Sequence, residues 1–130
     1  MGREPLSPGA RSLISAHIDS VRRLELLLLL RDRADERWTP DAVAATLRVA
    51  PAWTTRELEA LRSGGLLVAG EDEEGTYRYA APPGDDRFVG ELADAYRRRK
   101  STVVQAILSA MDSDVQALSD AFRLRDRSDG

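Results

Sequence analysis

Two helical segments separated by only three residues constrain the fold of this sequence more than any other feature. Pro40 follows a threonine that is a good N-cap, and proline suits the first helical position, so a helix is predicted over 40–47. Residues 48–50 form a tight turn, after which Pro51 opens a second helix that is predicted to end at Ser63. The pattern is therefore helix, turn, helix.

The start of the second helix has two readings. Pro51 suits a first helical position, but Thr54 and Glu57 have capping-box spacing. The helix therefore begins either at Pro51 or near Thr55.

A β-hairpin is expected directly after this helix. Gly64-Gly65 ends the helix, because glycine readily adopts the left-handed conformation of a C-terminal cap. The apolar segment 66–69 and the alternating segment 76–80 read as two short strands, and the polar loop 70–75 between them begins and ends with glycine. Four carboxylates lie in this loop, so the hairpin is predicted to have an acidic tip.

The rest of the chain is predicted to be helical, apart from its first residues. Residues 1–11 are rich in proline and glycine and read as a flexible tail. Apolar patterns predict helices over 12–18 and 21–34, the second of which is apolar nearly all round and therefore central to a core or in contact with a partner. One long helix is predicted from 85 to 110, and a last helix follows from Ser113.

Composition excludes several classes of site. The sequence has 130 residues, no cysteine and one histidine, which rules out a disulfide framework, a thiolate nucleophile and a multi-histidine metal site. It holds 19 Lys and Arg against 22 Asp and Glu, a net charge of −3, so any contact with nucleic acid must come from local placement of charge. The longest apolar run spans 26–30, far short of a membrane span, and a cytoplasmic location with no membrane partner is expected.

Catalytic motifs are missing from the sequence. Gly64-Gly65 lacks the spacing of a phosphate-binding loop, and no serine lies in a nucleophile elbow. The acidic loop lacks the alternating ligand spacing of a calcium site. The chain is therefore expected not to be an enzyme and to need no cofactor or metal.

The order of helix, turn, helix and hairpin resembles the winged helix-turn-helix family. The likeness is carried by 39–47, by Leu58 to Leu66 with its two glycines, and by Tyr77-Arg78-Tyr79, and it extends over about residues 20–82. With its flanking helices, the sequence is similar to small bacterial winged-helix transcriptional regulators. The resemblance implies a mainly α, α+β fold with a two-stranded β-hairpin wing and a C-terminal helical extension.

The resemblance also implies a division of the chain and a homodimer. Residues 1–11 would be the flexible tail, 12–82 the winged helix-turn-helix domain, and 85–130 C-terminal helices that pair two subunits. A helix over 85–110 would be roughly 39 Å long, more than a small domain needs to cover its core. The side chains expected between subunits are Phe88, Leu92, Tyr96, Val103, Ile107, Leu118 and Phe122.

In that family the second helix of the pair enters the major groove of double-stranded DNA, and the wing contacts the adjacent backbone or minor groove. The resemblance implies that Arg56 reaches a guanine edge and that Thr55 meets a thymine methyl group or a phosphate. Arg78, on the second strand, would contact phosphate. The outward positions of the helix over 51–63 are expected to be Ala52, Thr55, Arg56, Glu59 and Arg62.

Charge departs from what DNA binding by this family requires. The helix over 51–63 carries two arginines against two glutamates, and the tip 71–74 carries four carboxylates and no base. Carboxylates at a phosphate backbone are repelled, because DNA affinity depends largely on neutralising phosphates. The alternatives are a tip that points away from DNA into solvent, a winged-helix module that binds protein and not DNA, and an adaptor whose acidic tip mimics the charge of DNA.

Arg97, Arg98, Arg99 and Lys100 form a concentrated block of positive charge within one helical turn. The block fits a DNA phosphate, an acidic partner or the acidic tip of another subunit. It fits equally an ordinary solvated band on a long helix.

Four further side chains are expected to have structural roles. Trp38 is expected to pack against the domain, and Tyr77 and Tyr79 share one face of the hairpin and are expected to cover the helix over 51–63. His17 is expected at the surface or at an interface.

Overall fold

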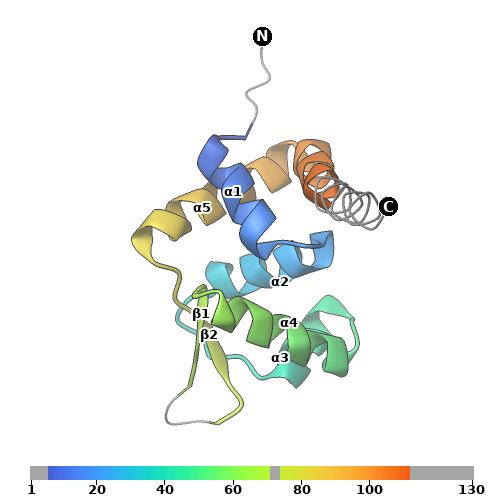
Figure 1. Ribbon diagram of the computed structural model, residues 1–130. Helices are drawn as coiled ribbons and strands as arrows, with labels where there is room; N and C mark the ends of the chain where they lie inside the picture. The colour runs from blue at the N-terminus through green and yellow to red at the C-terminus, as the bar shows by residue number, and fades with distance from the viewer. Residues whose placement is uncertain (1–5, 71–73, 112–130) are drawn as a thin grey trace, which may run out of the picture.

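The computed structural model describes residues 6–70 and 74–111. The described part is mainly helical and contains one two-stranded antiparallel hairpin (Figure 1), as the sequence predicts. Beyond the last of the bounded elements, residues 100–111 are also helical. The elements in chain order are α1 (Pro8–His17), α2 (Val21–Asp32), α3 (Pro40–Leu47), α4 (Pro51–Ser63), β1 (Leu67–Ala69), β2 (Tyr77–Tyr79) and α5 (Pro83–Arg98).

The helix-turn-helix pair α3–α4 has the bounds that the sequence predicts. The Thr39 hydroxyl oxygen accepts a hydrogen bond of 3.1 Å from the backbone N–H of Ala42, so Thr39 is the N-cap of α3. α3 ends at Arg48, which adopts the left-handed conformation with φ of 59°. α4 then begins at Pro51 and not near Thr55, and it has no side-chain cap.

The hairpin β1–β2, hereafter the wing, is extended by a residue from outside it. Leu67 pairs with Tyr79 and Ala69 with Tyr77 in the ladder. Trp38 adds a bridge to the free side of β2, because its backbone N–H and carbonyl both bond to Tyr77 at 2.8 Å. The connection between α2 and α3 therefore ties the wing to the start of α3.

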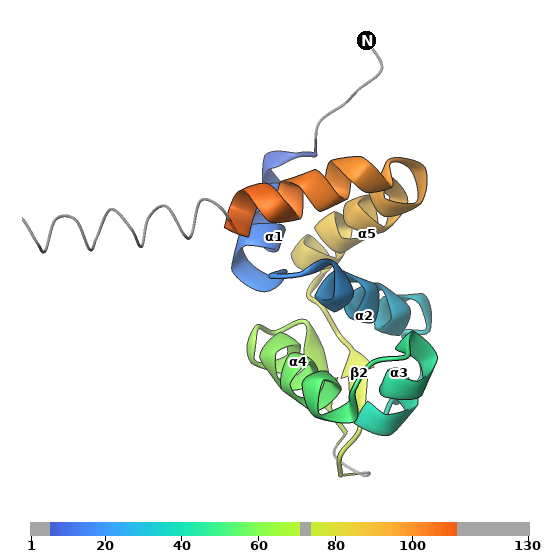
Figure 2. The ribbon, with the colours of Figure 1, turned by 90° about the vertical axis from the view of Figure 1, so that its right-hand side faces the viewer.

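α1, α5 and the helical residues 100–111 lie together on the side of the molecule away from the wing (Figures 1 and 2). Ser7 joins α1 to α5, because its backbone N–H and its hydroxyl donate to the Glu91 carboxylate at 2.8 and 2.6 Å. Gly9 faces the Phe88 ring so closely that no Cβ would fit there. This group of helices is the upper layer.

α2 lies between the upper layer and the rest of the molecule, which consists of α3, α4 and the wing and is hereafter the winged half. The apolar residues of α2 connect the two. Leu24, Leu26, Leu27 and Leu30 are all fully buried. They belong to one core cluster that reaches from Leu6 through the wing to residues 103 and 107 of the upper layer. The near-continuous apolar surface of α2 is thus explained by its central position, as the sequence indicates.

Two sequence predictions about the upper layer are wrong. Residues 8–11, predicted within a flexible tail, form the first turn of α1, where Ala10 is fully buried. The single helix predicted over 85–110 is broken at Arg99, whose φ and ψ are −141° and 63°. The break folds the following helix back onto the core, where Val103 is buried, and this burial outweighs the continuity of one long helix.

Among the described residues, no helix has both the length and the apolar character that are needed to cross a bilayer.

Candidate functional site

The predicted outward positions of α4 face solvent. Ala52, Thr55, Arg56 and Arg62 are exposed and Glu59 is half-buried, and these five residues are hereafter the outer face of α4. The opposite side of the helix is buried in the core through Thr54, Glu57, Leu58 and Leu61. The 3.6-residue period of α4 therefore separates a packing side from a side that is free to meet a partner.

Arg56 has no hydrogen-bond or ion-pair partner within the part of the chain that the structure describes. The Thr55 hydroxyl donates to the Pro51 carbonyl oxygen at 3.1 Å, which directs this side chain back along the helix. Arg56 consequently presents an unpaired guanidinium one turn into the outer face of α4.

Arg62 is paired, in contrast to Arg56. Its Nη2 lies 2.9 Å from Oε1 of Glu59, and its Nε lies 3.2 Å from both carboxylate oxygens. Glu59 also accepts a 2.5 Å hydrogen bond from the hydroxyl of Tyr77 on the wing. The chain of contacts Tyr77–Glu59–Arg62 therefore joins the wing to the outer face of α4, and it neutralises one of the two arginines there.

The pKa values of this trio follow from the contacts. The hydrogen bond from Arg62, and then the one from Tyr77, hold the pKa of Glu59 below its ordinary value of 4.5. Burial, followed by the hydrogen bond to Glu59, raises the pKa of Tyr77 to about 12. Glu59 is therefore ionised and Tyr77 is protonated across the physiological pH range.

The buried side of α4 is fixed by an ion pair to α2. Arg23 Nε lies 2.7 Å from Oε1 of Glu57, and the two side chains are only 15% and 12% exposed. Arg23 also contacts Asp19 at 3.2 Å and donates to the His17 carbonyl oxygen at 3.0 Å. Sequence reasoning missed this pair, because it assigned Glu57 to a local capping box.

The wing is fixed at its other end to α5. The Tyr79 hydroxyl donates to the Asp86 carboxylate at 2.6 Å, and Arg31 Nε on α2 donates to the same oxygen at 3.0 Å. The hydroxyl of Tyr77 thus reaches α4, as the prediction that the hairpin tyrosines cover this helix requires, whereas the hydroxyl of Tyr79 reaches α5. Arg78 between them is exposed and has no partner in the described ranges.

The basic block at the end of α5 is not a free patch. Arg97 and Arg98 both pair with Asp94, at 3.5 and 3.2 Å. Lys100 lies over the Tyr96 ring with its Nζ 5.1 Å from the ring centre. Arg99 is the residue at which α5 ends. One carboxylate, that of Asp94, is thus shared by two arginines, so part of the positive charge of the block is compensated locally.

The residues expected between subunits fall into three groups. Leu92, Val103 and Ile107 are fully buried inside the single chain, so the structure assigns them to its own core. Phe88 and Tyr96 are half-buried. Phe88 packs against Gly9, and the Tyr96 hydroxyl donates a 3.2 Å hydrogen bond to Glu25. Leu118 and Phe122 lie outside the described residues. The side chains of the upper layer that do expose large apolar groups are Leu108 and Met111, at 50% and 44%.

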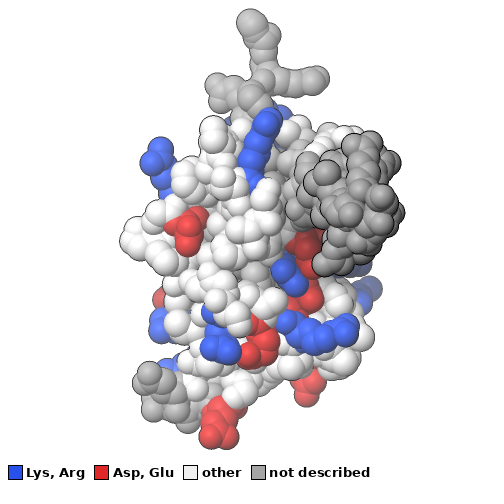
Figure 3. Space-filling model, in the orientation of Figure 1, with Lys and Arg blue, Asp and Glu red and all other residues white. Residues whose placement is uncertain are grey.

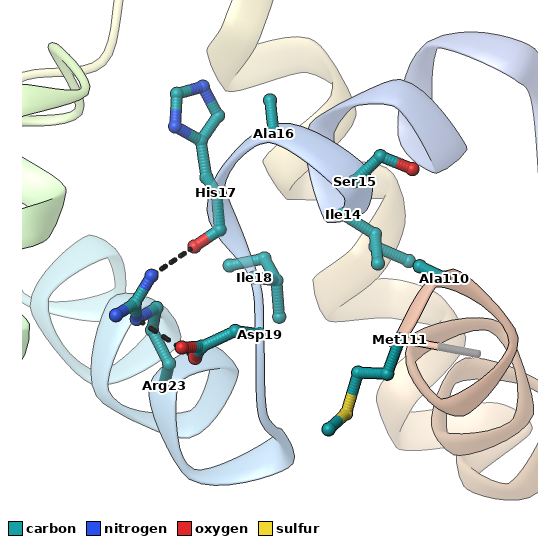
Figure 4. A pocket seen from close by; sticks show the side chains of 9 residues that line it. All are labelled: Ile14, Ser15, Ala16, His17, Ile18, Asp19, Arg23, Ala110 and Met111. Carbon is teal, nitrogen blue, oxygen red and sulfur yellow. Dashed lines mark hydrogen bonds and ion pairs between the residues drawn. The ribbon is translucent and has the colours of Figure 1, made fainter. Parts of the chain in front are cut away.

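A cavity of about 70 Å³ lies where the α1–α2 connection meets the end of the helical residues 100–111 (Figure 4). Asp19 and Arg23 line one side of it and Met111 the other. Ligand pockets usually measure about 300–1,000 Å³, so this volume suits a few water molecules. Within 6–70 and 74–111, no three acidic or histidine side chains are grouped as a metal site would require.

The surface charge is finely mixed on the face shown in Figure 3. In its lower half, Lys and Arg side chains lie among Asp and Glu side chains and form no single broad basic area. Any attraction for a polyanion on this side of the molecule must therefore come from single arginines.

Comparison with known proteins yields matches among solved structures only. No protein-family model matches the chain, and no curated protein does. The chain is similar to a doubly substituted variant of ZitR from Lactococcus lactis, with 19% identity and a TM-score of 0.48 over 79% of this chain and 75% of that one. A singly substituted ZitR variant gives 18% identity and a TM-score of 0.47 over 85% and 75%. The likeness concerns only the way in which the helices and the hairpin are arranged.

Proposed function

We propose that this protein is a transcriptional regulator that binds double-stranded DNA as a homodimer, with α4 in the major groove. The observation that carries the proposal is the guanidinium of Arg56, which has no partner within 6–70 and 74–111 and lies on the exposed side of the second helix of a helix-turn-helix pair. An arginine in this place suits bidentate contact with O6 and N7 of guanine. The largely buried Arg23–Glu57 ion pair joins α4 to α2 behind it.

Contacts with phosphate come from the neighbouring elements. Arg48 in the turn before α4 and Arg78 on the wing are both exposed and lack a partner among the described residues. The first turn of α4 has no side-chain cap, so its backbone N–H groups and the positive end of the helix dipole favour an anion. Together these groups position the duplex, and Arg56 reads it.

The homodimer is supported by the exposed apolar groups of the upper layer. Leu108 and Met111 lie three residues apart on one helix and face solvent. Pairing of two upper layers would leave both copies of α4 on the outside, where they would meet half-sites about 34 Å apart or a multiple of that distance.

The test is a fluorescence anisotropy titration of the full chain with a pool of random-sequence duplexes and with genomic fragments, at several salt concentrations. Wild-type protein is expected to bind with an affinity that falls steeply as salt rises. Arg56→Ala is expected to weaken binding to the preferred fragment by about 1–3 kcal/mol. Arg11→Ala is the matched control, because Arg11 is also exposed and unpaired in the described structure but lies on α1. Absent or salt-insensitive binding by the wild type overturns the proposal.

A second function is favoured by the compensation of charge. Arg62 pairs with Glu59, and Arg97 and Arg98 share Asp94, which lowers the net attraction for phosphate. A winged-helix module that binds a protein partner needs no such attraction. Capture of a partner from native lysate after nuclease treatment, unaffected by Arg56→Ala, together with no DNA binding at low salt, would support this function instead.

A further inference from the structure

We infer that Glu59 limits how tightly this protein binds DNA: held by Tyr77 of the wing, it masks the charge of Arg62 and so removes one phosphate contact. The inference rests on the proposed function. It assigns different roles to the two arginines on the outer face of α4. Arg56 contacts a base, whereas Arg62 makes no phosphate contact because Glu59 binds it.

The geometry places Glu59 between two donors on different elements. Arg62, one turn further along α4, contacts both carboxylate oxygens, and Tyr77 approaches from the wing. These donors occupy three of the roughly four acceptor positions of a carboxylate. Glu59 therefore cannot turn away from the outer face of α4 without losing bonds to both elements.

The hydrogen bond from Tyr77 holds the Glu59 carboxylate beside Arg62 more firmly than an ordinary surface ion pair would. An exposed ion pair three residues apart on a helix contributes little and opens easily. Here the hydroxyl of Tyr77 adds a third bond, and Tyr77 is itself buried and fixed through its backbone to Trp38. The carboxylate is thus held in place from the wing, and Tyr77 is a positioning residue.

The mask acts on the phosphate contacts that both kinds of complex share. Binding to arbitrary sequence depends almost entirely on neutralised phosphates, whereas binding to a preferred sequence adds base contacts. A carboxylate beside Arg62 removes one phosphate contact from both kinds of complex, so both affinities fall by a similar factor and both depend less on salt. The guanine contact through Arg56 is unaffected, so the mask lowers affinity without changing the ratio of the two affinities.

The experiment compares wild type, Glu59→Gln and the double variant Glu59→Gln/Arg62→Ala on two probes. One probe is the random-sequence duplex pool, and the other is the duplex that the wild type enriches from it. For Glu59→Gln, the slope of log affinity against log salt is expected to steepen by about 0.9, the value for one further phosphate contact. Affinity for the pool and affinity for the enriched duplex are expected to rise by a similar factor, and the double variant is expected to return to the wild-type slope.

Glu25→Gln is the matched control. Glu25 is likewise bound by an arginine three residues away, Arg22, and by a tyrosine hydroxyl, that of Tyr96, but it lies on α2. It undergoes the same loss of charge and is expected to leave the salt slope unchanged. Tyr77→Phe keeps the charge of Glu59 and removes only the bond from the wing, so it is expected to steepen the slope by a smaller amount and serves if Glu59→Gln does not fold.

The outcomes separate this inference from the proposed function. Wild-type binding that depends on salt and on Arg56, with unchanged slope and unchanged affinity in Glu59→Gln, overturns the role of Glu59 and leaves the proposed function standing. An equal change in the Glu25→Gln control also overturns it, because the effect would then be one of net charge. Absence of wild-type binding overturns the proposed function and, with it, this inference.

Discussion

Each of the three tyrosines donates its hydroxyl to a carboxylate on another element. Tyr77 reaches α4, Tyr79 reaches α5, and Tyr96 reaches from α5 to α2. Each hydroxyl is the polar end of a largely apolar ring, so one side chain both fills the core and fixes the neighbouring element. Single residues thus set the orientation of the wing at both of its ends.

High pH is expected to destabilise the fold through these tyrosines. Their pKa values are raised, in each case chiefly by burial and for Tyr77 to about 12, while an unfolded tyrosine titrates near 10.0. A raised pKa means that the stabilising contribution is complete below pH 10 and is lost as pH rises towards the folded value. Tyrosinate absorbance should therefore appear later in folded than in urea-unfolded protein. Coincident titration of the two states would contradict the expectation.

Asp86→Asn is expected to destabilise the protein by about 1 kcal/mol at neutral pH, because Tyr79 and Arg31 lose a charged acceptor. Hydrogen bonds from Tyr79 and Arg31 lower the pKa of Asp86 from 3.8, so its contribution is present above pH 3.8 and is lost as pH falls through the lower folded value. The difference from wild type in urea unfolding should therefore shrink in acid. Asp85→Asn, in the same helical turn, is the control.

At the scale of the elements, α1 contacts the C-terminal end of α4 where His17 packs closely against Gly64. A Cβ built on Gly64 would lie 2.7 Å from Nδ1 of His17. His17, expected at the surface or at an interface, is half-buried and lies at a junction within the chain. α4 is therefore in direct contact with the upper layer.

Gly64→Ala is expected to destabilise the fold by about 1–3 kcal/mol, the usual range for overpacking. The φ of Gly64 is −77°, which alanine adopts freely, so the cost is steric and should fall in a His17→Ala background. Gly84→Ala is the control, because no atom lies within 4 Å of its added Cβ. Chemical denaturation of the four proteins measures the effect, and an equal loss in both backgrounds would refute the steric explanation.

How far the sequence predicts each element depends on the range of the interactions that define it. The bounds of α3 and α4 follow from local signals at Thr39 and at two prolines, and the structure confirms them. The start of α1 has the same kind of local signal, a Ser7 N-cap followed by a proline, which the sequence reading missed. The bond from Ser7 to Glu91, 84 positions away, is a contact that no local pattern contains. The break at Arg99 depends likewise on burial of Val103 and Ile107 by distant segments.

The same distinction applies to the candidate site. Helical periodicity is enough to predict which side of α4 is exposed. It does not reveal that Glu59 bonds across to Tyr77, or that Glu57 pairs with Arg23, because these contacts join separate elements. The sequence shows both arginines of α4, but it does not predict which of them lacks a partner among the described residues.

At the scale of the whole molecule, the chain is expected to be a dimer in solution, with a mass by light scattering near twice the 14.3 kDa of one chain. Leu108→Glu should yield monomers that remain folded, because Leu108 is half exposed in the single chain. Val68→Glu is the control, since Val68 is an exposed apolar residue of similar kind on the wing. A wild-type mass of one chain at micromolar concentration would refute the dimer.

The contact between α1 and α5 also has a consequence for how the protein is made. The winged half and α2 find most of their partners within a continuous stretch of chain, so they can fold while the ribosome is still adding residues. α1 is synthesised first, but its partner α5 emerges long after it, and Leu6 and Ala10 are buried only once the two have met. The earliest helix of the nascent chain is therefore among the last to dock, and until then its apolar side is open to chaperones.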